Sequence, residues 1–289
     1  MKNYTTLSEL LKDYRKLNNI SQADLSARLN VDIRTLIRWE NNETLIKSDK
    51  EEELVEETFI PYQVIRNLNA NVAIPTFYDF RLRKYSYSIL SIELPKASWF
   101  KEHLNIESLR SRAISNDSDA EHISRYLNFF YAPNTLSKDL ILEAARILPE
   151  LNQILFDTSG YYAGHCVIFP IKKEIYEKIR NKEMSERELK SSCFTTVKTN
   201  DETIFYSYNI TADCNENTFY ILCPVLKYFQ EYGSGNYRFA SYALRKDAFE
   251  LAEQLGLKLI WQEEKTDIFH GLEFLPRFYE GNFNEFLLG

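Results

Sequence analysis

Two arginines one helical turn apart are the first residues in this chain whose types and spacing indicate a particular chemistry. Arg34 and Arg38 are four positions apart and follow Ile33, and residues at that spacing share one face of a helix. Leu36 and Trp39 fall on the other side of such a helix, where they can enter a small core. The pattern predicts an outward face with two guanidinium groups and an isoleucine, available to read another molecule.

A helix, a tight turn and a second helix must position this face. Ser21 is a favourable N-cap, and Asp24 three residues later completes an acidic capping box, so a first helix is expected to begin here. Asn30 can adopt the left-handed backbone that a sharp turn requires. Asp32 then caps the second helix, which is expected over residues 32–41. Two short helices at a sharp angle are therefore predicted.

These residues match, position by position, the helix-turn-helix family of Cro and the phage repressors, which the stretch resembles. Gln22 stands where that family places a phosphate-contacting glutamine, and Asn30 stands at its usual glycine. Leu36 matches the buried aliphatic residue of the second helix, and residues 38–41 (RWEN) match the closing signature. The resemblance implies a DNA-binding transcriptional regulator of the repressor type.

The same resemblance implies a role for each residue of the motif. The implied base contacts in the major groove are Ile33, Arg34 and Arg38. The implied phosphate contacts are Gln22, Thr35 and Asn41. Arg15, in the preceding helix, would form a structural ion pair with Glu40. Double-stranded DNA is then the expected partner, bound by a homodimer.

The charge of this region limits how such a contact would work. Residues 1–70 contain ten Lys and Arg but twelve Asp and Glu, and the whole chain has a net charge of -7. The region therefore lacks the broad basic footprint of many DNA-binding domains. Binding is expected to depend on a few well-placed contacts and on dimerisation.

Length and composition give further expectations. The chain has 289 residues, 44% of them hydrophobic, which is enough to form two domains with buried cores. No apolar stretch is long enough for a membrane span and no signal segment opens the chain, so no membrane partner and a cytoplasmic location are expected. The four cysteines lack metal-ligand or disulfide spacing, so no metal site is expected.

The expected order along the chain is a five-helix domain, a linker and a larger domain. Residues 1–70 form the helix-turn-helix domain, and residues 71–97 form an extended linker with prolines near both ends. Residues 98–289 begin with a helical lead-in and continue as alternating strands and helices. A mixed sheet flanked by helices is the predicted architecture of this domain.

Part of the larger domain resembles the GNAT superfamily of acyl-CoA N-acyltransferases, over roughly residues 140–289. Residues 163–170 followed by 172–176 look like that family's central strand running into a helix. Residues 248–257 look like its late helix and the strand entry after it. The resemblance implies a GNAT-like fold.

The residues expected of a GNAT enzyme are mostly absent. The stretch that corresponds to the glycine-rich pyrophosphate loop, residues 211–220, has no glycine and contains Asp213 and Glu216. Pro224 removes a donor close to the expected start of the next helix at Val225. Acyl-CoA is therefore expected to be poorly accommodated.

Two further positions depart from the family's pattern. The tyrosine that often acts as general acid aligns with Ala252, and the asparagine before it aligns with Arg245. We therefore expect no catalytic residue and no cofactor, and a domain that senses a small-molecule effector or supports dimerisation. One alternative is an N-acyltransferase that uses acetyl-CoA and has an attached DNA-binding domain. A second alternative is an antitoxin-like module that binds a partner protein.

Other polar residues of the larger domain offer little chemistry. Tyr206, Tyr208, Tyr242 and His165 can line a cleft, but tyrosines on strands usually pack with a hydrogen-bonded tip. We therefore interpret them as packing residues.

Overall fold

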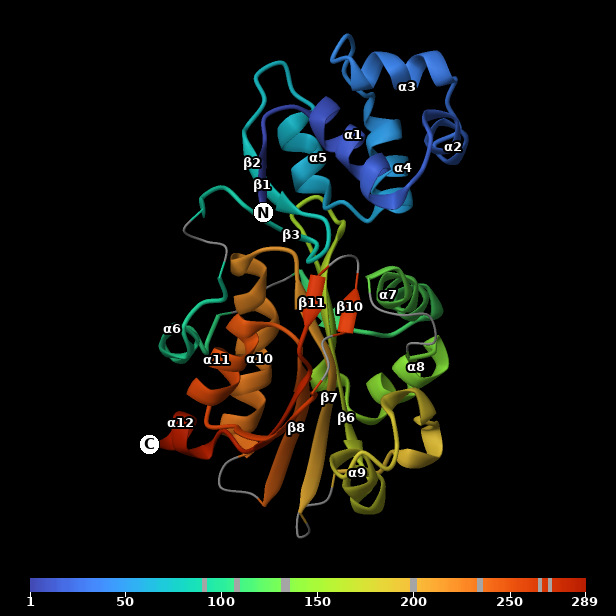
Figure 1. Ribbon diagram of the computed structural model, residues 1–289. Helices are drawn as coiled ribbons and strands as arrows, with labels where there is room; N and C mark the ends of the chain where they lie inside the picture. The colour runs from blue at the N-terminus through green and yellow to red at the C-terminus, as the bar shows by residue number, and fades with distance from the viewer. Residues whose placement is uncertain are drawn as a thin grey trace. The chain divides into compact units, whose positions relative to one another are not determined.

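The computed structural model contains two compact units, Met1–Ile92 and Glu93–Gly289 (Figure 1). The structure describes residues 1–89, 93–106, 110–130, 136–197, 202–232, 236–264, 267–269 and 272–289.

The first unit is built from five helices, as the sequence predicts. They are α1 (Leu7–Asn18), α2 (Gln22–Arg28), α3 (Ile33–Glu40), α4 (Ser48–Thr58) and α5 (Tyr62–Leu68). Side chains with almost no exposed surface fill the space between them, among them Leu10, Leu11, Leu25, Leu36 and Leu54. The apolar stripe of each short helix is buried against its neighbours, which stabilises helices too short to persist alone.

A small antiparallel sheet completes the first unit. β1 (Lys2–Tyr4) pairs with β2 (Thr76–Asp79), which pairs with β3 (Lys84–Ser86). The segment 71–97, expected to be an extended linker, therefore contributes two strands to this unit. In the turn before β3, Arg83 Nε donates to the carbonyl oxygen of Phe59 at 2.6 Å. That hydrogen bond ties the hairpin to the junction between α4 and α5.

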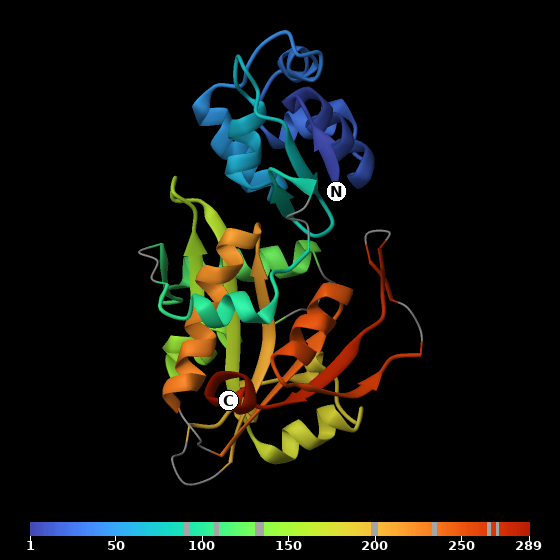
Figure 2. The same ribbon diagram turned by 90° about the vertical axis from the view of Figure 1, so that its left-hand side faces the viewer.

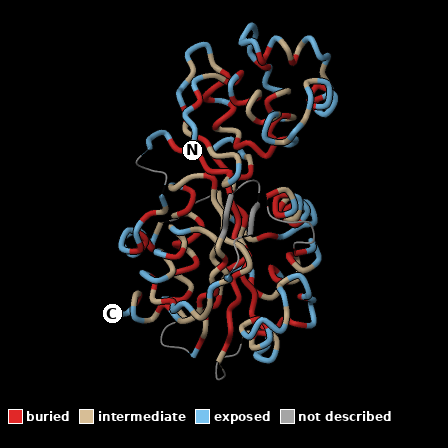
Figure 3. The backbone as a smooth tube through the Cα atoms, in the orientation of Figure 1, coloured by how far each residue is buried: buried red, intermediate tan, exposed pale blue. Residues whose placement is uncertain are grey.

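The second unit is a seven-stranded mixed sheet flanked by helices, which confirms the predicted architecture. The strand order is β4-β5-β6-β7-β8-β12-β9. The strands of this sheet are β4 (Ser111–Ala113), β5 (Asn152–Phe156), β6 (Tyr162–Ile171), β7 (Thr203–Ala212), β8 (Tyr237–Ala243), β9 (Lys258–Gln262) and β12 (Arg277–Gly281). A separate hairpin is formed by β10 (Asp267–Phe269) and β11 (Leu272–Phe274). Figure 3 shows the central strands as mostly buried, and every residue of β6 is buried.

Helices cover both faces of this sheet (Figures 1 and 2). One layer contains α6 (Ala97–Glu102), α10 (Asn215–Tyr232), α11 (Lys246–Gln254) and α12 (Asn284–Leu288). The other layer contains α7 (Asp117–Phe130), α8 (Lys138–Ile147) and α9 (Lys173–Arg180). Three 3-10 turns join these elements, η2 (Pro149–Leu151), η3 (Glu186–Glu188) and η4 (Ser191–Cys193).

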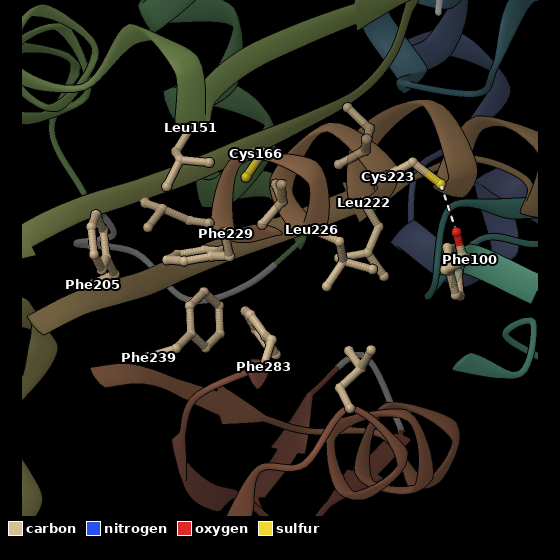
Figure 4. Close-up of a cluster of buried hydrophobic side chains, with 14 of the residues drawn as sticks. Phe100, Leu151, Cys166, Phe205, Leu222, Cys223, Leu226, Phe229, Phe239 and Phe283 are labelled. Carbon is tan, nitrogen blue, oxygen red and sulfur yellow. Dashed lines mark hydrogen bonds between the residues drawn. The ribbon is translucent and has the colours of Figure 1, made fainter. Parts of the chain in front are cut away.

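The core under α10 is rich in aromatic rings (Figure 4). Phe229 of α10 packs edge-on against Phe205 of β7 and Phe239 of β8, with ring centroids 5.0 and 5.7 Å apart. Phe283 lies 5.2 Å from the same ring. Edge-to-face pairs at these distances are favourable because a positive ring edge meets a negative ring face.

The helix α10 is longer than the sequence predicts. It begins at Asn215, whereas the expected helix begins at Val225, and Pro224 lies inside it. Proline in a helix interior costs about 3 kcal/mol because it removes a hydrogen bond and crowds the preceding turn. Buried residues on both sides of the proline, including Ile221 and Phe229, offset this cost. The expected position of Pro224 near the helix start is therefore wrong.

The only parallel strand pair in the described sheet is β7 and β8, which α10 connects. Their pairing runs from Thr203 opposite Tyr237 to Ser207 opposite Ser241. Beyond this point β7 continues along β6 and β8 continues along β12. The mixed character of the sheet comes from this single crossover.

The helical lead-in predicted for the larger domain is interrupted. The sequence predicts a helical lead-in over residues 99–131, but among the described residues of this range the short strand β4 lies between α6 and α7. β4 pairs antiparallel with β5, Ser111 opposite Leu155. Pairing with a strand about forty residues away decides the structure here, which local periodicity does not reveal.

Candidate nucleic-acid interface

The turn between α2 and α3 has the caps that the sequence predicts. Ser21 Oγ accepts from the backbone N–H of Asp24 at 3.1 Å, and Asp24 Oδ2 accepts from the backbone N–H of Ser21 at 2.9 Å. Hydrogen bonds from the Ser21 side chain and backbone lower the pKa of Asp24. Asn30 adopts a positive φ of 47°, the left-handed conformation that the turn needs.

The helix α3 has one buried side and one exposed side. Leu36 is fully buried and Trp39 is 7% exposed. Ile33 is 40% exposed, and Arg34 and Arg38 are both exposed. This places two guanidinium groups and one isoleucine on the accessible side of the helix.

The remaining motif residues lie around that face in different environments. Asn41, the C-cap of α3, is exposed, and its Nδ2 donates to Glu43 Oε1 at 3.1 Å. Thr35 and Gln22 are half-buried. The structure thus places these polar groups on the first turn of α2, on α3 and just after it.

An ion pair joins α1 to the end of α3. Arg15 Nε lies 2.5 Å from Glu40 Oε1, and Arg15 Nη2 lies 2.9 Å from Glu40 Oε2. Gln22 Nε2 donates to Glu40 Oε2 at 2.7 Å. The Glu40 side chain is only 1% exposed, so three helices meet at one buried carboxylate.

The electrostatics of Glu40 follow from these contacts. Burial alone would raise the pKa of this carboxyl group, because desolvation disfavours the charge. The hydrogen bonds from Arg15 and Gln22, together with the positive charge of Arg15, outweigh burial and lower the pKa of Glu40 below its ordinary value of 4.5. Glu40 is therefore ionised at neutral pH, as the bidentate geometry requires.

Sequence reasoning missed Lys50, which holds the turn from outside the motif. Its Nζ donates to the carbonyl oxygens of Leu29 and Asn30 at 3.2 and 3.4 Å. The same nitrogen binds Glu53 at 2.6 Å. The spacing of Lys50 and Glu53 in the sequence predicts only their ion pair. It does not predict the hydrogen bonds to carbonyl groups twenty residues earlier.

Ion pairs neutralise part of the acidic helix α4. Glu51 pairs with Arg66 at 3.3 Å and is 1% exposed, while Glu53 pairs with Lys50. Two of the carboxylates that made the region look acidic are therefore paired within it. Because each pair also uses one basic residue of the same region, the net charge of the region is unchanged.

The candidate cleft residues of the second unit have separate partners. Tyr206 donates to Glu186 Oε1 at 2.6 Å, and Tyr208 Oη accepts from the backbone N–H of Leu136 at 3.0 Å. His165 Nδ1 and the Tyr162 hydroxyl are 2.5 Å apart. Within the described part of the chain, no three His, Cys, Asp or Glu side chains are placed to hold a metal ion.

The junction between β7 and α10 carries a buried acid. Asp213 is 2% exposed, and its Oδ1 accepts from Asn217 Nδ2 at 2.7 Å. Glu216, in the first turn of the helix, has a side chain that is 73% exposed. An anion that approached this helix start would meet two carboxyl groups, and repulsion would oppose the attraction of the backbone N–H groups.

Comparison with known families assigns the N-terminal motif. Residues 11–56 match the family model described as helix-turn-helix, so they form a helix-turn-helix of that family. No curated protein sequence matches the chain significantly. None of the helices that the structure describes is both long enough and apolar enough to cross a membrane.

Solved acetyltransferase structures share low similarity with the chain. Arabidopsis thaliana NAA60 in complex with acetyl-CoA is 12% identical, with a TM-score of 0.40 over 60% of this chain and 98% of its own. A polyamine N-acetyltransferase of Drosophila melanogaster is 11% identical, with a TM-score of 0.37 over 60% of this chain and 98% of its own. A Corynebacterium glutamicum acetyltransferase related to HPA2 is 13% identical, with a TM-score of 0.31 over 58% of this chain and 93% of its own.

Proposed function

From the helix-turn-helix that residues 11–56 form, we propose that this protein is a cytoplasmic, sequence-specific DNA-binding transcriptional regulator of the repressor type. The observation that carries the proposal is the division of α3 into two sides. Leu36 and Trp39 are buried, which leaves Ile33, Arg34 and Arg38 exposed on a helix of eight residues. A helix of this width fits the major groove of B-DNA.

The exposed side chains match the chemistry of base edges. Arg34 or Arg38 can donate two hydrogen bonds to O6 and N7 of guanine, and each such pair contributes about 1–3 kcal/mol of discrimination. Ile33 can contact the methyl group of thymine. Sequence preference then comes from these three residues.

Phosphate contacts fix the register of α3 on the duplex. Thr35 lies in the first turn of α3, Asn41 is the C-cap of that helix, and Gln22 begins α2. One N–H of the Gln22 amide is used by Glu40, and the second remains for a phosphate oxygen. The hydrogen bond to Glu40 therefore sets the orientation of the Gln22 side chain before DNA binds.

A homodimer supplies the affinity that one unit lacks. The first unit has no excess of basic residues, so counterion release from a single copy is small. Two copies related by a two-fold axis would place α3 in successive major grooves about 34–36 Å apart. The operator is then an inverted repeat with half-sites about one helical turn apart.

We further propose that the second unit is not catalytic and serves as a sensor or dimerisation domain. The acid Asp213 lies at the β7–α10 junction, where an acyl-CoA enzyme needs free backbone donors. Arg245 is held by Asp247 through a 3.0 Å hydrogen bond from Nε to Oδ1. Ala252 has no hydroxyl group with which to protonate a thiolate.

Sequencing of genomic fragments that the purified chain retains would test the DNA-binding proposal. We expect enrichment of one inverted repeat, with footprints in consecutive major grooves. Uniform retention of unrelated fragments would overturn sequence-specific regulation. Isothermal calorimetry with acetyl-CoA tests the second proposal separately, because micromolar affinity together with turnover of an amine would show an enzyme.

A further inference from the structure

The ammonium group of Lys50 lies at the C-terminal end of α2, although Lys50 itself belongs to α4. Its Nζ donates to the carbonyl oxygens of Leu29 at 3.2 Å and Asn30 at 3.4 Å. It also donates to the two carboxylate oxygens of Glu53, at 2.7 and 2.6 Å. One side chain therefore joins the turn that follows α2 to the first turns of α4.

The carbonyl groups that Lys50 binds are of the kind that a helix end leaves without an intrahelical partner. The carbonyls of residues 25–27 accept from the backbone N–H groups of residues 29–31. The carbonyls of Leu29 and Asn30 receive the ammonium group instead. A cation at this end of a helix is also favoured by the helix dipole, whose negative end lies there. Lys50 therefore completes the C-terminal cap of α2.

The donors of Lys50 are all used inside the protein. An ammonium group has three N–H donors, and Nζ has four oxygen acceptors within 3.4 Å, two from carbonyl groups and two from Glu53. The Lys50 side chain is 20% exposed, and the carboxylate of Glu53 matches its charge. Binding of a phosphate by Lys50 would break these contacts, so the geometry favours an internal role.

The turn that Lys50 holds lies directly before α3. Asn30 is two residues from Asp32, which is the N-cap of α3 and whose Oδ1 accepts from the backbone N–H of Arg34 at 2.8 Å. Ile33 and Arg34 follow that cap, so the direction of their side chains depends on where the turn is fixed. Lys50 therefore acts on the first turn of α3, through the backbone of the turn.

We propose that Lys50 is a positioning residue for base recognition, which fixes the first turn of α3 without touching DNA. The inference rests on the proposed function, because it concerns the reading of bases by Ile33 and Arg34. Hydrogen bonds to a base edge weaken steeply when donor and acceptor are misaligned. Loss of the ammonium group should therefore reduce discrimination at the base pair that Arg34 contacts, and affect the base pair that Arg38 contacts less.

Lys50→Met tests the proposal, since methionine keeps a long side chain but removes the three donors. Affinities of the full chain for the operator and for unrelated duplex are measured across a salt series. We expect the ratio of the two affinities to fall about fivefold or more, as when a base contact is lost. Affinity for unrelated duplex should change by less than about twofold, with an unchanged salt slope.

Lys47→Met is the matched control. Lys47 is exposed at the N-cap of α4, and its replacement changes the net charge of the chain by the same amount. The ratio of operator to unrelated affinity should stay that of the parent chain. A fall in the ratio equal to that of Lys50→Met would show that charge alone is responsible, and would overturn the proposal.

Two other roles for Lys50 predict different results. If Lys50 bound a phosphate, both affinities would drop together and the salt slope would become shallower by about one unit. If Lys50 only stabilised the fold, both affinities would fall by the same factor, because each scales with the folded fraction. Either result leaves the affinity ratio unchanged and would overturn the proposal. Should Lys50→Met not fold, Glu53→Met keeps the ammonium group without its anionic anchor and should lower the same ratio; an unchanged ratio there would count against the proposal.

Carbonyl ¹³C resonances of Leu29 and Asn30 report the contact without DNA. Both should move in Lys50→Met, because each carbonyl loses a hydrogen bond, and neither should move in Lys47→Met. Unchanged resonances would overturn the proposal whatever the operator is. If the resonances move but the parent chain prefers no duplex, the proposed function fails and the positioning role fails with it. If the parent chain prefers an operator and Lys50→Met keeps that preference, only the role of Lys50 is refuted.

Discussion

Arg15 and Glu40 form a bidentate ion pair that ties α1 to the last residue of α3, with oxygen–nitrogen distances of 2.5 and 2.9 Å. The Ser8 hydroxyl donates to the backbone carbonyl of Glu40, so the helix end is held by side chain and main chain. Arg38 lies only two residues earlier. The pair therefore sets the direction in which the exposed face of α3 points.

Arg15→Met should destabilise the first unit by about 3–5 kcal/mol, because it leaves a buried carboxylate without its cationic partner. Hydrogen exchange of the α3 amides in the full chain measures the loss. The double variant Arg15→Met, Glu40→Met should recover much of the stability, since no buried charge then remains. A single variant as stable as the parent would contradict a structural role for the pair.

Replacement of Arg38 by Ala should remove preference at the base pair that Arg38 contacts, while leaving the fold intact. Loss of one bidentate contact corresponds to about 1–3 kcal/mol of discrimination, and Arg34→Ala is expected to act in the same range at a different base pair. Competition binding at fixed salt measures the ratio of affinities. Arg146→Ala, which removes a 72% exposed charge in the second unit, is the control. Unchanged site preference in both α3 variants would refute the base contacts.

Asn30 should tolerate glycine but not alanine. Its φ of 47° lies in the left-handed region, where a Cβ without a compensating polar group costs about 1–2 kcal/mol. We expect Asn30→Ala to lower the unfolding free energy of the first unit by that amount, and Asn30→Gly to change it little. Hydrogen exchange of α2 and α3 amides reports both. Equal losses would show that the asparagine side chain, and not the backbone conformation, matters.

The second unit should lose stability as the pH rises from about 4.5 to 7 through Glu186. Burial raises the pKa of this carboxyl group from 4.5 to about 7, although the hydrogen bond from Tyr206 opposes the shift. The unfolded chain releases this proton at lower pH than the folded chain, so the stabilisation is complete below 4.5 and is lost as the pH passes 7.

Thermal unfolding of Glu186→Gln against pH measures this contribution. The variant should show a flatter dependence between pH 4.5 and 7 than the parent chain. Glu188→Gln is the control on the same short turn, because Glu188 is exposed and its pKa is lowered by hydrogen bonds from Ser185. Identical slopes for Glu186→Gln and the parent would rule out Glu186 as the titrating group.

The helix-turn-helix could be predicted from the sequence because short-range interactions determine it. The capping box of Ser21 and Asp24, the left-handed Asn30 and the apolar pair Leu36 and Trp39 act within four residues or one turn. Each depends mainly on neighbouring residues, so α2 and α3 were predicted to within a residue or two. The mixed sheet of the second unit was predicted for a similar reason, because strand and helix periodicities alternate along the chain.

Residues far apart in sequence decided the rest. Lys50 reaches carbonyl groups twenty residues earlier, and β1 pairs with β2 more than seventy residues later. The full length of α10 depends on a core that receives rings from β7, β8 and the C-terminal segment. The sequence by itself determined where helices begin, which faces are apolar and which motif opens the chain, because those depend on neighbouring residues. Only the tertiary structure decided which charges meet, because burial and pairing depend on packing between distant segments.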